Sequence, residues 1–313
     1  MSDFTWVEKY RPQKIEDCIL PTIIKKTFKD FVKTGEIQNM LLFGPPGIGK
    51  TTVAKTLCLE LGVDSIVING SDEGRFLDTV RNKAKNFAST VSLTSSANHK
   101  VIIIDEADNT GHDVQMSLRA FIEEFSNNCR FIFTCNYKNK IIPPIHSRCS
   151  VIDFNIRGKE KAEVANTFFK RLNSILEQEK IEFEKKVVAA LIEKYFPDWR
   201  RVLNECQRYS IGGKIDSGIL TIISDVKTDN LVAYIKEKNF SEMRKWVTQN
   251  LDNDSVPLLR LIFDALLPSL EGGNIATALM ILADYQYKSA FAVDQEINMA
   301  ACLTEIMAEC EFK

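Results

Sequence analysis

Eight consecutive residues near the N-terminal end of the chain match the phosphate-loop pattern G-x-x-x-x-G-K-[ST] without exception: Gly44, Pro45, Pro46, Gly47, Ile48, Gly49, Lys50 and Thr51. They lie between an apolar run that predicts a strand (residues 40–43) and a stretch that predicts a helix (51–61). In such a loop, backbone N–H groups and the helix N-terminus bind phosphate oxygens. Lys50 adds a cation for the β- and γ-phosphates, and the Thr51 hydroxyl is a Mg²⁺ ligand. A glycine-rich turn that binds nothing is the alternative, but it requires neither residue. We therefore expect the loop, with the adjacent Thr52, to bind ATP.

An acidic pair follows the apolar run 101–104. Asp105 stands at the carboxyl end of this predicted strand, where α/β sheets bind ligands, and its carboxylate is placed to hold Mg²⁺ through water. Glu106 is placed to orient and deprotonate an attacking water. An acidic pair that merely caps the next helix is the alternative. The following predicted strand ends at Asn136, which we expect to position the water or to sense the γ-phosphate.

Strand and helix patterns alternate in the first half of the 313-residue chain and give way to helices alone after Phe154. The predicted strands are short and rich in Ile, Val and Phe, which is typical of a parallel sheet buried on both faces. The sequence thus predicts an α/β domain with flanking helices over residues 1–156 and two helical domains over 157–228 and 229–313. The strands are expected at residues 40–43, 65–69, 100–105, 130–136 and 150–154, and helices at 51–61, 77–87, 114–125 and 257–270.

Composition excludes several other classes of protein. Hydrophobic residues make up 45% and charged residues 26% of the chain, and the net charge of −2 gives no global attraction to nucleic acid or membrane. The eight cysteines include no C-x-x-C pair, so a structural zinc site is not expected. No signal peptide or membrane-spanning run is recognisable, and a cytoplasmic location is expected.

Several motifs, in order along the chain, resemble those of replication clamp-loader ATPases of the AAA+ type. The N-terminal W-V-E-K-Y-R-P (residues 6–12) and the S-R-C box (147–149) are the most specific. Further matches lie at residues 67–72, 78–81, 87–90 and 198–204. Within this family the chain is most similar to the large, multi-copy subunit of T-even-like bacteriophages, and archaeal and eukaryotic small subunits are the neighbouring groups.

The resemblance implies roles that the residues alone do not. Arg148 of the S-R-C box would act as an arginine finger on the ATP of an adjacent subunit, and Arg200 would be a cis-acting sensor on the helical lid, residues 157–228. Tyr10, Arg11 and Pro12 would lie against the nucleotide base. Without the resemblance, Arg148 would be interpreted as a surface loop residue and the three N-terminal residues as ordinary packing.

The family also binds DNA through backbone phosphates, which predicts contacts from Arg75, Arg81, Lys83 and Lys85. A solvated helix face explains these charges equally well. Gln115 matches a position on the family's central helix and is expected to couple DNA contact to the ATP site.

The resemblance implies an ATPase subunit that uses ATP and Mg²⁺ to open a ring-shaped sliding clamp and hydrolyses ATP when primer–template DNA binds. Its partners would be further copies of itself, a distinct partner subunit, the clamp and the DNA, with the C-terminal helices (229–313) forming a collar for oligomerisation. Three alternatives stay open: another AAA+ DNA motor, a helicase loader, and an ATP-binding structural subunit with little turnover. Residues 105–108 also spell the D-E-A-D tetrapeptide of a helicase class, but that class requires a second α/β domain, and we interpret the match as coincidence.

Overall fold

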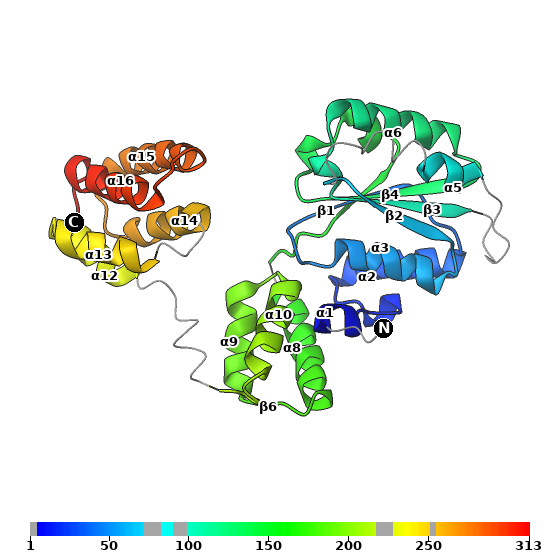
Figure 1. Cartoon of the computed structure of the whole chain (residues 1–313), viewed down its shortest axis with the longest axis horizontal. Helices are drawn as coiled ribbons and strands as arrows, with labels where there is room; N and C mark the ends of the chain where they lie inside the picture. The colour runs from blue at the N-terminus through cyan, green and yellow to red at the C-terminus, as the bar shows by residue number, and fades with distance from the viewer. Residues whose placement is uncertain (1–4, 72–82, 90–98, 159, 217–227, 251–254) are drawn as a thin grey trace. The chain divides into compact units, whose positions relative to one another are not determined.

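The computed structural model describes two compact units, Met1–Leu220 and Thr221–Lys313 (Figure 1). The residues it describes are 5–71, 83–89, 99–158, 160–216, 228–250 and 255–313. The domain boundaries expected at 156 and 228 stay predictions.

A five-stranded parallel sheet forms the centre of the first unit, in the order β2-β3-β4-β1-β5. The bounds are β1 (Met40–Phe43), β2 (Ser65–Asn69), β3 (Lys100–Asp105), β4 (Cys129–Cys135) and β5 (Ser150–Asp153). Because β4 is inserted between β1 and β3, its carboxyl end lies beside both the phosphate loop and the acidic pair. All five predicted strands are present, and only the limits of β4 and β5 differ, by one residue.

Helices cover both faces of the sheet, with α6 (His112–Glu124) on one face and α2 (Thr22–Thr34) and α3 (Lys50–Glu60) on the other (Figure 1). Successive strand residues point to opposite faces, so an apolar run such as Val101–Ile104 is buried throughout. Burial on both faces was expected for every strand, and this is wrong for the edge strands. Both β2 and β5 keep exposed residues, because each pairs with a strand on one side only.

The remainder of the first unit is mainly helical. A lid is built from α8 (Glu160–Gln178), α9 (Lys185–Tyr195) and α10 (Trp199–Ser210). The sequence predicts helices alone here, but β6 (Glu182–Phe183) and β7 (Lys214–Ile215) pair in parallel. Two residues per strand are too few to show a period in the sequence. The shorter elements are α1 (Trp6–Lys9), η1 (Ile15–Asp17), α5 (Lys85–Ser89), η3 (Ala107–Asn109), η4 (Lys138–Lys140) and α7 (Pro143–His146).

The lid and the N-terminal segment are joined by specific contacts. Within the lid, the indole of Trp199 in α10 stacks on Phe168 of α8, with ring centroids 4.3 Å apart. The backbone N–H of Trp6 donates to the Gln207 side chain of α10 at 2.9 Å. On the sheet side, the Pro12 carbonyl accepts from Thr56 of α3 at 2.9 Å. The N-terminal segment therefore contacts both the lid and the helix that follows the phosphate loop.

The second unit is a bundle of helices, as predicted. They are α12 (Thr228–Lys236), α13 (Phe240–Asn250), α14 (Ser255–Leu266), α15 (Asn274–Ser289) and α16 (Gln295–Glu309). Their apolar faces meet in one core that includes Trp246, Ile262 and Leu303. Within the parts of the chain that the structure describes, every helix is too short or too polar to cross a bilayer.

Candidate active site

The phosphate loop connects β1 to α3 with three glycines at positive φ, Gly44, Gly47 and Gly49. Gly47 illustrates why glycine is required. Its φ is +70°, and a Cβ there would lie 1.8 Å from Oδ1 of Asp198. Asp198 caps the N-terminus of α10 by accepting from the Arg201 backbone N–H at 3.0 Å. The loop is therefore in direct contact with the start of the lid helix that carries Arg200.

Lys50 is 8% exposed, and its ammonium is surrounded by oxygen acceptors. Nζ donates to the carbonyls of Gly44 and Pro45 at 2.7 and 2.8 Å and to Oδ1 of Asn136 at 2.9 Å. Burial, reinforced by the Arg200 guanidinium, lowers the pKa of Lys50 to about 8. The structure thus brings together Lys50 and Asn136, two residues that are 86 positions apart in the sequence.

The acidic pair is held by threonines on both sides. Oδ1 of Asp105 accepts from the hydroxyl of Thr51 at 2.6 Å and from that of Thr134 in β4. The same Thr134 oxygen accepts from the backbone N–H of Glu106 at 3.2 Å. Thr134 is 1% exposed and was not identified from the sequence, where it is one more β-branched residue of a strand. It links Asp105, Glu106 and β4.

Glu106 has a left-handed backbone, with φ at +53°. Its carboxylate accepts from the Asn109 side chain at 3.2 Å. Gly70, at the end of β2, packs against this turn: its N–H donates to the Asp105 carbonyl at 2.7 Å, and a Cβ would lie 2.5 Å from the Glu106 carbonyl oxygen. The uncommon conformation of Glu106 is therefore supported by a close backbone contact.

Asp108, the last residue of the D-E-A-D tetrapeptide, has a structural role that was missed from the sequence. Its Oδ2 accepts from the backbone N–H groups of Asn136 and Tyr137, both at 3.0 Å. Its Oδ1 is buried without a hydrogen-bond partner among the described residues. Asp108 thereby fixes the end of β4 and, with it, the side chain that contacts Lys50.

Gln115 is 3% exposed on α6 and uses its whole carboxamide. Nε2 donates to the carbonyls of Thr110 and Lys140 at 3.1 and 3.0 Å, and Oε1 accepts from the Ile142 N–H at 2.8 Å. Thr110 follows the acidic turn, whereas Lys140 and Ile142 precede α7. Gln115 therefore joins the backbone behind Glu106 to the segment that leads to the S-R-C box.

A cavity of about 360 Å³ lies next to the phosphate loop. It is bounded by the N-terminal segment, the loop and the lid. Predicted nucleotide-binding residues that line it are Tyr10, Arg11, Pro12, Gly47, Ile48, Gly49, Thr52 and Arg200. The Tyr10 hydroxyl donates to Glu179 at 2.5 Å, and the Arg11 guanidinium pairs with Glu8. Both side chains thus have partners in the chain besides their contact with the cavity.

Arg148 lies at the opposite end of the sheet from the phosphate loop. It shares a surface hollow of about 440 Å³ with Asn39, which precedes β1, and Arg130, the second residue of β4. The loop follows the carboxyl end of β1. The length of β4 alone, seven residues, separates the two ends by about 20 Å. Arg148 therefore cannot reach the phosphate site of its own chain.

Two of the four predicted DNA contacts are described. Both are exposed: Lys83 lies just before α5, and Lys85 is its first residue. Arg75 and Arg81 lie outside the described residues, as does most of the helix predicted over 77–87.

The observed residues fit a magnesium nucleotide. The buried ammonium of Lys50 beside a loop of positive-φ glycines suits an anion, because a phosphate oxygen there would stabilise the charged form that burial disfavours. The oxygens of Thr51 and Asp105, 2.6 Å apart, are the hard ligands that Mg²⁺ prefers when phosphate supplies the others.

Comparison with known proteins identifies the family to which the two parts of the first unit are similar. Residues 40–157 match the model of the ATPase family associated with various cellular activities (AAA), and 160–221 match the model of the sliding-clamp-loader large subunit, AAA+ ATPase lid domain. The sliding-clamp-loader large subunit of Enterobacteria phage T4 is 35% identical over 98% of this chain and 96% of its own length. The replication factor C small subunit of Thermofilum pendens is 32% identical over 98% of this chain and 97% of its own. A solved mutant of Thermotoga maritima RuvB, 17% identical, has the same fold with a TM-score of 0.53 over 72% of this chain and 80% of its own.

Proposed function

Because the chain belongs to the sliding-clamp-loader family of AAA+ ATPases, we propose that it hydrolyses ATP as one of several subunits that load a ring-shaped clamp onto primer–template DNA. One observation carries the enzymatic part of the proposal. The insertion of β4 between β1 and β3 gathers Lys50, Asp105 and Asn136 at the carboxyl ends of these three strands. An ATP-binding subunit without turnover would not need the acidic pair so arranged.

Hydrolysis is assigned to side chains at this carboxyl end of the sheet. Glu106 takes a proton from the attacking water, and Asn136 orients that water against the γ-phosphate. Lys50 neutralises charge on the β- and γ-phosphates, and Arg200, on the lid, senses the same nucleotide. Mg²⁺ bound by Thr51 and Asp105 would neutralise further charge on the phosphates.

The site is completed in trans by Arg148. Its place at the far end of the sheet supports this assignment, because a guanidinium there is out of reach of its own nucleotide site and lines a surface hollow. An arginine supplied in trans stabilises charge on the transferring phosphoryl group and makes hydrolysis depend on assembly. The neighbours are further copies of this chain and a distinct partner subunit.

DNA is proposed to trigger hydrolysis. Lys83 and Lys85, together with Arg75 and Arg81, contact backbone phosphates, so that binding follows DNA shape rather than base sequence. Gln115 transmits the contact, because its three hydrogen bonds connect the turn behind Glu106 to the segment that precedes α7. ATP binding opens the clamp, and hydrolysis releases it closed on DNA.

Steady-state ATP turnover tests this proposal. The chain is assayed alone and with its partner subunit, clamp and primer–template DNA, and in parallel as Arg148→Ala. We expect turnover to rise with clamp and DNA and to collapse in Arg148→Ala while ATP still binds. Turnover that ignores clamp and DNA would exclude clamp loading, and a full complex that binds ATP without turnover would make the chain a structural subunit.

A further inference from the structure

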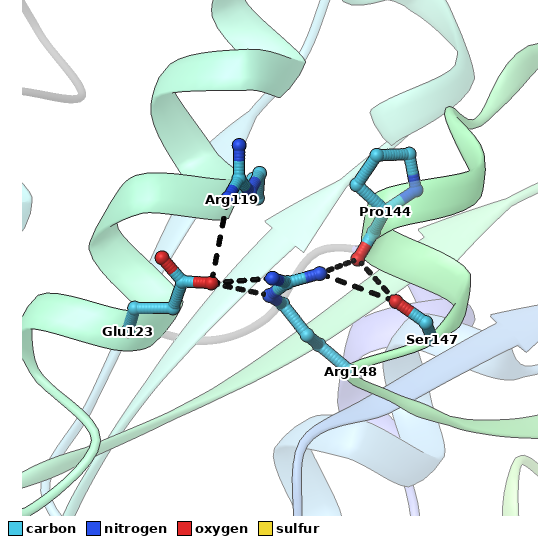
Figure 2. A network of polar contacts seen from close by, with 5 residues as sticks. All are labelled: Arg119, Glu123, Pro144, Ser147 and Arg148. Carbon is cyan, nitrogen blue, oxygen red and sulfur yellow. Dashed lines mark hydrogen bonds and ion pairs between the residues drawn. The ribbon is translucent and has the colours of Figure 1, made fainter.

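The Arg148 guanidinium is enclosed by partners from its own chain (Figure 2). On one side, Nε and NH2 both donate to Oε1 of Glu123, with the Nε contact at 2.9 Å. On the other side, NH1 donates to the Pro144 carbonyl at 2.8 Å and to the Ser147 hydroxyl at 3.2 Å. Four contacts thus hold a side chain that is 28% exposed.

A guanidinium has five N–H donors, and these contacts use four of them. The edge formed by Nε and NH2 is one of the forks with which arginine binds carboxylate or phosphate. Glu123 occupies that edge. An oxygen of a neighbouring subunit's phosphate can bind it only after the Glu123 carboxylate has left.

Glu123 has a second partner that makes such an exchange feasible. Arg119, one turn earlier on α6, places NH2 3.7 Å from the same Oε1, and its Nε is buried without a hydrogen-bond partner among the described residues. Hydrogen bonds and charge from Arg148, with a smaller effect of Arg119, hold the pKa of Glu123 below its usual value. When Arg148 departs, the carboxylate stays paired with Arg119.

Glu123 is on the same helix as Gln115, which binds the backbone that follows the acidic turn. Glu123 and Gln115 both belong to α6, eight residues or about 12 Å apart. Gln115 binds the backbone at residues 140 and 142, just before α7, and α7 supplies the Pro144 carbonyl that accepts from Arg148. A movement of α6 relative to α7 therefore changes both the hydrogen bonds of Gln115 and the contact between Glu123 and Arg148.

We propose that Glu123 is a positioning residue that holds the Arg148 guanidinium within its own chain, and that Arg148 engages the neighbouring subunit's ATP by exchanging Glu123 for phosphate oxygens while Arg119 takes over the carboxylate. The proposal rests on the trans role given to Arg148 above. It assigns to Glu123 a restraint on hydrolysis before clamp and DNA are bound.

The test uses Glu123→Gln in the assembly of this chain with its partner subunit, assayed without and with clamp and DNA. Glu124→Gln, one residue along the same helix, is the matched control. Glutamine keeps the shape and one acceptor but loses the charge. We expect unstimulated ATP turnover to rise about two- to fivefold, as loss of one half-exposed ion pair allows, with little change in the rate at saturating clamp and DNA. Glu124→Gln should leave both rates at the wild-type level.

Two further variants separate the possible failures. Arg148→Ala combined with Glu123→Gln should behave as Arg148→Ala alone, because the effect of Glu123 passes through Arg148. Unstimulated turnover that is unchanged or lower in folded Glu123→Gln, or higher in the double variant than in Arg148→Ala, overturns the proposal. If Arg148→Ala alone keeps full stimulated turnover, the trans role itself is wrong.

Discussion

Thr134→Val removes the hydroxyl that joins Asp105 to Glu106 while keeping the volume of a fully buried side chain. Asp105 loses a charge-assisted hydrogen bond, worth about 1.5–3 kcal/mol, and the Glu106 N–H loses its acceptor, at a cost of about 1–3 kcal/mol. The two losses share one oxygen and are not additive. We therefore expect the free energy of unfolding of the first unit to fall by about 2–4 kcal/mol.

The same change acts on catalysis, because Thr134 fixes the turn that carries Glu106. A displacement on the order of 1 Å in a catalytic group lowers turnover by up to about 100-fold, so we expect kcat to fall about 10- to 100-fold. Thr134→Ser is the matched control. It keeps the hydroxyl, loses one buried methyl group worth about 0.8 kcal/mol, and should retain most of kcat.

Urea unfolding followed by circular dichroism and steady-state ATP turnover in the assembled complex measure the two effects. If the Thr134 hydroxyl bridges Asp105 and Glu106, the valine variant is both less stable and slower than the serine variant. If the valine variant equals or exceeds the serine variant in stability and turns over like wild type, the bridging role of Thr134 is refuted.

Two further perturbations address the phosphate loop and the acidic turn. The pKa of about 8 for Lys50 predicts that ATP affinity is flat below pH 8 and falls above it, by at most about tenfold per pH unit, because the neutral amine cannot pair with phosphate. ATP titrations from pH 7 to 9.5 check this, with Lys50→Arg as the variant whose charge persists, and a flat wild-type profile would contradict it. Gly70→Ala forces the Glu106 carbonyl away from a Cβ at 2.5 Å and should lower both thermal stability and kcat. Gly272→Ala, with open space around its Cβ, should leave both almost unchanged, and equal effects of the two substitutions would argue against the clash.

The phosphate loop and the acidic pair could be recognised from sequence because each is a contiguous motif with a fixed strand context. Apolar runs of four to seven residues likewise located the strands, since burial on both faces removes polar residues from them. Helix limits in the α/β part were predicted to within a residue or two, as for α3, which begins at Lys50 rather than Thr51, whereas α14 ends four residues before the predicted limit of 270.

What the sequence does not reveal depends on which strands become neighbours. Thr134 acquires its role only because β4 pairs with β3, and before pairing it resembles any β-branched strand residue. Asp108 reaches Asn136 for the same reason. Glu123 is one of several exposed charges on α6, and nothing local indicates that Arg148, 25 residues later, will bind it.

Assembly in trans is tested most directly by mixing two inactive variants. Glu106→Gln has no general base but supplies Arg148, whereas Arg148→Ala keeps an intact site and supplies no finger. We expect each variant alone, assembled with partner subunit, clamp and DNA, to have little ATP turnover. Mixed assemblies should recover a substantial part of it, because Arg148 of one copy then completes the site of the other. Turnover in the mixture no higher than the sum of the separate variants would contradict the claim that Arg148 acts on a neighbouring subunit.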